Sequence, residues 1–171
     1  MTIISKTSFF IKTLRSLPLI LLFFSVLNQG DFNYLNVKYF SFNFPFILIF
    51  FWSLKKSESL GYGLIFLAGL INDILVGFPI GMSCINYLLI CGFAAYLRNM
   101  TLRPNLINDW IFFLITLSII NSFHYSVLSI FFQIHLDYLQ LIFNTLFTFL
   151  FYFIFAYIFR FYLALVFGDK S

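Results

Sequence analysis

Apolar residues fill most of this chain, and polar residues cluster at intervals that divide it into six apolar blocks. Each block approaches the ~20 residues that an α-helix needs to cross a bilayer, although the second and third are slightly shorter. We therefore predict six transmembrane helices and an interfacial tail, at approximately residues 9–27, 39–54, 60–76, 80–97, 110–132 and 139–160, with the tail over 161–171.

Composition supports this division and limits the number of domains. Hydrophobic residues make up 62% of the chain and charged residues 9%, with a mean hydropathy of +0.99. So little polar surface does not cover a soluble globule of 171 residues. The short loops leave no room for a soluble domain. We predict one polytopic membrane domain over residues 1–171, an all-α six-helix bundle.

The basic residues give the predicted orientation. With the first predicted helix entering from the cytoplasm, alternation of the six spans places nine of the ten Lys and Arg residues on the inner side and leaves only Lys38 outside. This excess is typical of cytoplasmic loops. Both termini are therefore predicted to be cytoplasmic. The dispersed basic residues lie beside apolar segments, a pattern that indicates topology and not nucleic-acid binding.

The segment from Gly69 to Gly81 carries the one acidic residue expected inside a predicted span, Asp73. An ionised Asp at the bilayer centre costs about 2.5 to 3.5 kcal/mol on insertion scales, so it needs a partner, a wet cavity or an interface. Gly77 and Gly81 permit positive φ, and Pro79 does not suit an unbroken helix, so we predict a turn just after Asp73. Two interpretations stay open: a structural turn anchored by Asp73, or a partner-binding segment.

Catalytic groups near Asp73 are not evident in the sequence. The remaining acidic residues fall in predicted loops or tails, each isolated from the next: Asp31, Glu58, Asp109, Asp137 and Asp169. No H-E-x-x-H, G-x-S-x-G or P-loop pattern is present in the chain. The sequence therefore predicts a protein that is not an enzyme, with no catalytic, cofactor-binding or metal-binding residues and no cofactor.

Polar residues of the fifth and sixth predicted helices are candidates for contacts inside the membrane. Counted from residues 60 and 110, Asp73 is 13 positions into its helix and His124 is 14, which places them at similar depth. We predict that Asp73 pairs, directly or through water, with His124 or Asn121; the alternative is that His124 is a satisfied core residue. Asn144 and Thr148 share one helix face and are expected to make an interhelical contact.

A family resemblance rests on the same segment. The pattern Gly-Leu-x-x-Asp-x-x-x-Gly-x-Pro-x-Gly resembles that of the bacterial rod shape-determining protein MreD family, and it is matched here by Gly69, Leu70, Asp73, Gly77, Pro79 and Gly81. Pro45 and the run ending in Phe51-Trp52 are similar to the second helix of that family. The chain length and the short loops agree as well.

The resemblance implies a non-enzymatic, multi-pass scaffold of the bacterial cytoplasmic (inner) membrane. Such a protein belongs to the cell-elongation machinery, or elongasome, and takes part in rod cell-shape maintenance and lateral peptidoglycan synthesis. The implied partners are an MreC-type protein bound through transmembrane helices, indirectly an MreB-type filament and the peptidoglycan synthases, and the lipid bilayer. Nucleic acid is not an implied partner, and the oligomeric state stays open.

An alternative function comes from a shared architecture. MreD-like proteins are similar in overall fold to the substrate-binding subunits of energy-coupling-factor transporters. The chain would then be the membrane subunit that binds a vitamin for such a transporter. An outward cavity with convergent polar groups would be required, and the sequence offers Asn72, Asp73, Asn86, Asn121 and His124 for its walls.

Overall fold

The computed structural model describes residues 16–28, 40–56, 59–100, 105–133 and 137–167. These ranges contain six helices and no strand, which confirms the predicted all-α class. The helices are Ser16–Leu27, α2 (Phe44–Lys55), α3 (Tyr62–Val76), α4 (Met82–Met100), α5 (Leu106–Phe131) and α6 (Tyr138–Phe167). Residues 9–15 of the first predicted helix, residues 168–171 of the tail and six of the ten basic residues lie outside the described ranges.

Two helix starts differ from the prediction because polar capping residues define them. Helix α2 begins at residue 44 and not 39, since the Asn43 side chain accepts a hydrogen bond from Phe46 N (3.3 Å) and Pro45 occupies the first turn, where no N–H is needed. Helix α5 begins at residue 106 and not 110, since the Asn105 side chain accepts from Ile107 N (3.2 Å). Helix α6 runs through residue 167 without a break at the predicted membrane exit, Arg160.

Helix α2 forms the centre of the molecule. All of its residues from Phe44 to Leu54 are buried, as expected for a helix that is apolar on every side. The Phe50 ring packs against Phe113 of α5 and Tyr152 of α6, with ring centroids 5.0 and 5.7 Å apart. One core cluster joins buried residues of all six described helices. The second predicted span is therefore enclosed by other helices.

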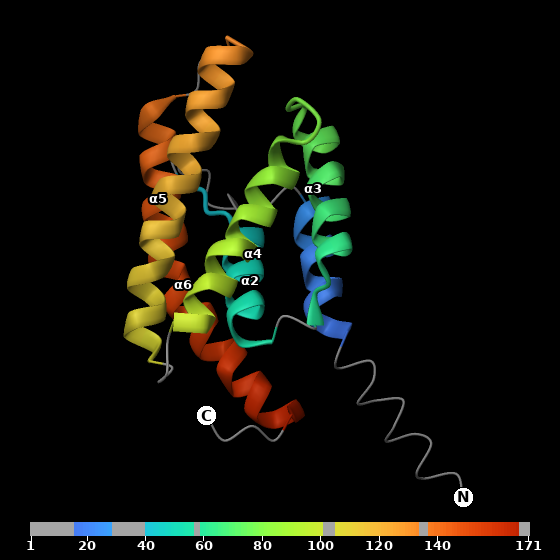
Figure 1. The fold of residues 1–171 in the computed structure, drawn as a ribbon, viewed down its shortest axis with the longest axis vertical. Helices are drawn as coiled ribbons and strands as arrows, with labels where there is room; N and C mark the ends of the chain where they lie inside the picture. The colour runs from blue at the N-terminus through green and yellow to red at the C-terminus, as the bar shows by residue number, and fades with distance from the viewer. Residues whose placement is uncertain (1–15, 29–39, 57–58, 101–104, 134–136, 168–171) are drawn as a thin grey trace, which may run out of the picture.

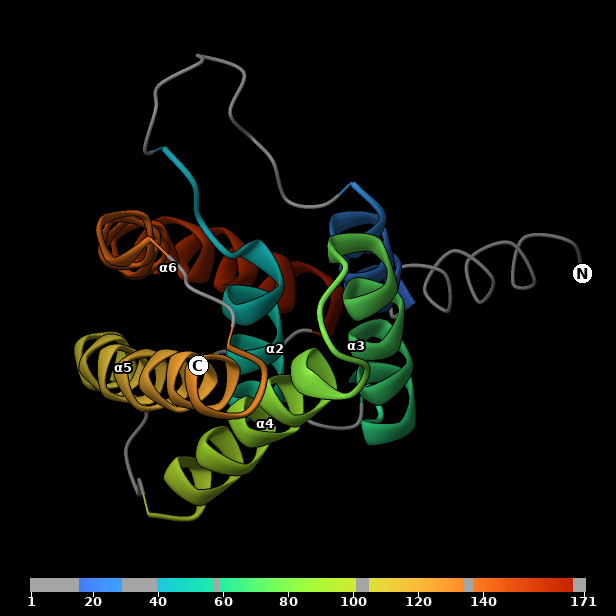
Figure 2. The same cartoon turned by 90° about the horizontal axis from the view of Figure 1, so that it is seen from above.

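Two helical hairpins lie on either side of α2. Figures 1 and 2 show the α3–α4 hairpin on one side, with the Ser16–Leu27 helix beside α3, and the α5–α6 hairpin on the other. The C-terminal part of α6 packs on the end of α2, where Trp52 contacts the Phe159 and Tyr162 rings. Side chains of α4 and α5 join the two hairpins.

Helices α5 and α6 are long and apolar enough to cross a membrane, judged by length and composition. Only 28% of the most apolar window of α5 and 17% of that of α6 is buried inside the protein, so most of their apolar side chains are exposed or only partly buried. The Ser16–Leu27 helix, α2 and α3 are shorter apolar helices. A crossing by all six helices stays a prediction.

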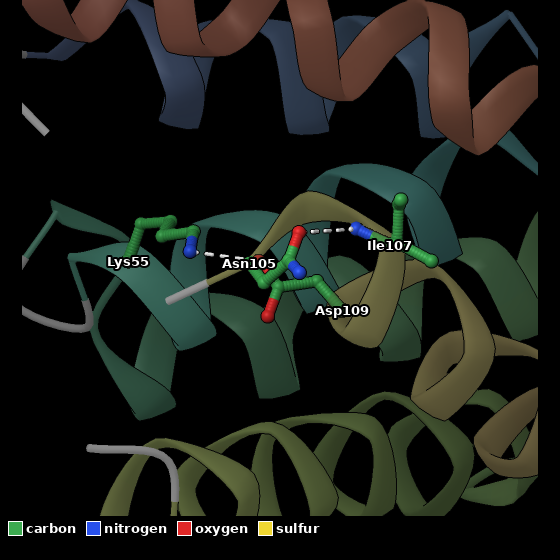
Figure 3. A network of polar contacts seen from close by, with 4 residues as sticks. All are labelled: Lys55, Asn105, Ile107 and Asp109. Carbon is green, nitrogen blue, oxygen red and sulfur yellow. Dashed lines mark hydrogen bonds and ion pairs between the residues drawn. The ribbon is translucent and has the colours of Figure 1, made fainter. Parts of the chain in front are cut away.

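An ion pair joins α2 to α5 at the end of the molecule opposite the α3–α4 turn. Lys55 Nζ lies 2.7 Å from Asp109 Oδ2 (Figure 3). The cation ends α2 and the anion begins α5, so both charges complement the helix dipoles. The prediction that Asp109 lies isolated in a loop is wrong, because Asn105 starts the helix ahead of it. Arg98 is at the same end and donates to Ser53 O (3.3 Å).

We expect Lys55→Met to destabilise the folded state by about 3 kcal/mol, because it leaves the Asp109 carboxylate buried without its cation. Thermal unfolding of the protein in detergent measures the change. Lys55→Arg keeps the charge and should unfold near the wild-type temperature, and adding Asp109→Leu to Lys55→Met should restore most of the loss. An unchanged melting temperature for Lys55→Met would show that the pair contributes nothing.

Candidate functional site

The carboxylate of Asp73, in the last turn of α3, is bonded to the start of α4. Oδ2 accepts a hydrogen bond from Gly81 N (2.7 Å) and Oδ1 accepts one from Ser83 N (2.8 Å). The first N–H groups of a helix have no partner inside that helix, and its positive dipole end favours an anion. Asp73 is 0% exposed, yet both of its oxygens are satisfied. It therefore caps α4 from the neighbouring helix.

The predicted turn after Asp73 is present and depends on two glycines with positive φ. Gly77 ends α3 at φ 77°, and its N–H and that of Phe78 both donate to the Asp73 carbonyl (2.9 and 3.1 Å). Gly81 has φ 102°, and the Pro79 carbonyl accepts from the first N–H of α4 (3.2 Å). Residues other than glycine rarely adopt such φ values. The α3–α4 corner, residues 69–84, is thus closed by backbone as well as by Asp73.

Gly69 sets the distance between α3 and α4. A Cβ at this position would lie 2.7 Å from both N and Cα of Cys84, so the two helix backbones are in direct contact there. Leu70, the next residue of the motif, is half-buried. A further link crosses the corner, where Asn72 Nδ2 donates to Ser83 Oγ (2.8 Å). Most residues that carry the family resemblance therefore have a defined structural role.

The predicted direct pairing of Asp73 with His124 or Asn121 is wrong, and a pairing through water stays a prediction. The Asn86 side-chain nitrogen lies 2.5 Å from His124 Nδ1, and Asn121 donates to a hydroxyl of α6 (2.7 Å). The His124 ring contacts Phe78 of the corner, with ring centroids 5.4 Å apart, so His124 lies beside the corner. The similar depth of Asp73 and His124 in a membrane stays a prediction. The Asp73 carboxylate is bonded instead to two N–H donors of its own hairpin.

A polar cavity of about 270 Å³ lies between the α3–α4 corner and the α5–α6 hairpin. Side chains of α3, α4, α5 and α6 line it, together with the segment before α2. Of the five polar residues that the sequence suggested for an outward cavity, the structure brings together four, Asn72, Asn86, Asn121 and His124. Asp73 is not part of the wall.

Six further polar lining residues were not anticipated as cavity groups: Ser41, Asn43, Ser83, Asp137, Gln140 and Asn144. Gln140 and Asn144 come from α6 and Ser41 from the segment before α2, and Asn144 Nδ2 donates to Ser41 Oγ (2.5 Å). Thr148, one turn further along α6, accepts from Asn43 N (2.8 Å). The shared face of Asn144 and Thr148 was visible in the sequence. Its contact is with the segment that leads into α2 and not with a helix.

Comparison of the chain with protein-family models, curated proteins and solved structures finds no match. Within the described ranges, no group of three or more His, Cys, Asp or Glu side chains is placed to hold a metal ion. Cys84 and Cys91 are buried free thiols. Two features of the structure thus bear on function, the Asp73 corner and the polar cavity beside it.

We expect Asp73→Ala to destabilise the protein by about 3 kcal/mol or more, because two buried N–H groups lose a charged acceptor. Asp73→Asn keeps one acceptor and should cost about 1 to 3 kcal/mol. Asp137→Asn is the matched control: Asp137 is exposed, and an Asn there can still accept from Leu139 N. Chemical denaturation in detergent measures all three. Equal stability of the three variants would contradict the capping role.

Gly69→Ala should destabilise the α3–α4 hairpin by about 1 to 3 kcal/mol, because the new methyl group meets the Cys84 backbone, which has no rotamer by which to move aside. Gly63→Ala on the same helix is the matched control, since nothing lies within 4 Å of its Cβ position. That control should be neutral or stabilising by up to about 1 kcal/mol. Similar melting temperatures for the two variants would rule out close packing at Gly69.

Proposed function

We propose that the chain is a non-enzymatic membrane scaffold of the bacterial cell-elongation machinery, of the MreD type. The observation that carries the proposal is the α3–α4 corner. Gly69, Asp73, Gly77 and Gly81, which carry the resemblance, each meet a different physical requirement of one structural unit. A chance match in a glycine-containing apolar segment has no reason to give most of the matched residues such a role. This agreement favours a genuine family motif.

In this proposal all six helices cross the inner membrane, with both termini cytoplasmic and the corner at the periplasmic face. Two observations support this arrangement, the first its orientation and the second the membrane crossing. Lys55 and Arg98 lie at the end of the molecule opposite the corner, the end that the positive-inside bias assigns to the cytoplasm. Helices α5 and α6 have the length and composition of membrane spans.

The proposed mode of action is association through helix surfaces. Asp73 is 0% exposed and both of its oxygens are bonded to the backbone of the same chain, so the carboxylate is not accessible to a substrate or a partner. Helix α6 instead presents large apolar side chains outward, such as Ile142, Leu150 and Tyr157. In a membrane such a surface is open to lipid tails and to another transmembrane helix. The proposed partner is an MreC-type protein, which links this scaffold to MreB-type filaments and peptidoglycan synthases.

Depletion and complementation in a rod-shaped host test this function. We expect depleted cells to become round, and the tagged full-length chain to co-purify an MreC-type protein. Asp73→Ala should fail to restore rod shape and Gly63→Ala should restore it, because only the first change opens the corner. Immunoblots of both variants separate loss of protein from loss of function. Depleted cells that stay rod-shaped, with no MreC-type protein recovered, would refute the proposal.

The polar cavity supports a second candidate, the substrate-binding subunit of an energy-coupling-factor transporter. Asn72, Asn86, Asn121 and His124 converge there, as that function requires. The two candidates differ in what the purified protein carries. A stoichiometric vitamin, together with association with an ATP-hydrolysing module, would favour the transporter subunit. An MreC-type partner without either would favour the scaffold.

A further inference from the structure

We propose that the cavity beside the α3–α4 corner binds a neutral, hydroxyl-rich group about the size of a monosaccharide, either as a free solute or as the headgroup of a lipid. The cavity holds about 270 Å³, the volume of roughly nine water molecules. The inference is independent of whether the chain acts as a scaffold or as a transporter subunit, since it concerns only what the cavity takes.

An unsatisfied buried group points to a ligand. Asn86 lines the cavity and is 3% exposed. Its side-chain nitrogen is engaged by His124, but its Oδ1 is buried and has no hydrogen-bond partner. Buried carboxamide oxygens in folded proteins almost always have a donor. As the side chain lies, Oδ1 has almost no accessible surface, so rotation of the Asn86 carboxamide would present it to a ligand hydroxyl, which would supply the missing donor.

The other polar walls have the same chemistry. Asn72, Asn121 and Asn144 each spend one donor on a neighbouring hydroxyl. A carboxamide offers two donors and one oxygen with two lone pairs, so every one of these side chains keeps unused capacity of both kinds. Hydroxyl groups also donate and accept. Phe46 and Tyr87 add apolar surface to the wall, as is usual in sites for small molecules.

The charges around the cavity disfavour an anion. None of the lining residues is a Lys or Arg, and the one carboxylate among them, Asp137, would repel negative charge. The N–H groups of Gly81 and Ser83, at the positive end of α4, are already taken by Asp73. These two donors are therefore not available to a phosphate or carboxylate. A cation would have no anionic partner deep in the cavity, since Asp137 is exposed at its mouth, so the part of the ligand that enters is uncharged.

The cavity is reached from the end of the molecule that bears the corner. Gln140 and Asp137, at the start of α6, are both exposed and line it. In the proposed orientation this is the level of the outer headgroups. A free solute and a lipid headgroup both reach that level. The experiment below therefore tests separately whether the hydroxyl-rich group belongs to a solute or to a lipid.

The test uses the full-length protein in phosphatidylcholine nanodiscs and two probes. Radiolabelled glucose is the free probe, measured by equilibrium binding. Monoglucosyl diacylglycerol added to the nanodiscs is the lipid probe, measured by native mass spectrometry after release from the disc. Glucose 6-phosphate is the anionic competitor. The variants are Asn86→Leu, Gln140→Leu and a matched control, Asn108→Leu, on the exposed surface of α5 and outside the cavity lining.

We expect saturable binding of at least one probe, weakened about tenfold by Asn86→Leu and about threefold by Gln140→Leu, and unchanged by Asn108→Leu. Binding of glucose assigns a free solute, and binding of the glucolipid alone assigns a headgroup. Where Asn86→Leu fails to fold, Gln140→Leu at the exposed mouth decides. Binding of neither probe, binding insensitive to both cavity variants, or tighter binding of glucose 6-phosphate than of glucose overturns the proposal.

Discussion

The bond between the Asp73 carboxylate and the first N–H groups of α4 is the constraint on which the rest of this structure depends. It fixes the angle at which α4 leaves the corner, and α4 in turn packs on α2 and α5. A carboxylate in an apolar hairpin is costly unless its charge is satisfied. Here the helix dipole and two backbone donors satisfy it. Asp73, whose charge would otherwise be unfavourable in an apolar hairpin, thereby orders the α3–α4 hairpin.

Structural and recognition roles are assigned to different residues. The corner uses Asp73 and its glycines, whereas the cavity uses carboxamides from several helices, among them Asn86 and Asn121. Charge at helix ends recurs at the other end of the molecule, where Lys55 closes α2 and Asp109 opens α5. Buried charges thus hold the two ends of the bundle. The cavity between the hairpins contains uncharged polar groups at its most buried positions.

Local chemistry was predictable from the sequence, and facing directions were not. Glycine and proline after a helix indicate a turn, so Gly77 and Pro79 located the corner from residue types alone. Counting along a helix estimates depth but not the side toward which a residue points, so His124 was given the wrong direct partner. Hydropathy also placed the start of α5 at the first long apolar run and missed the Asn105 cap. The shape of the cavity could not be predicted, because it is formed by the packing of helices that are distant in sequence.

Amide hydrogen exchange at Gly81 and Ser83 is the most direct test of the account, because it reads the donors that Asp73 is held to engage. In the wild-type protein we expect both amides to be protected. In Asp73→Ala both should exchange faster, while amides in the middle of α4, such as Ile90, stay protected. Fast exchange at Gly81 and Ser83 in the wild type, or identical exchange in the two proteins, would contradict the central role of Asp73.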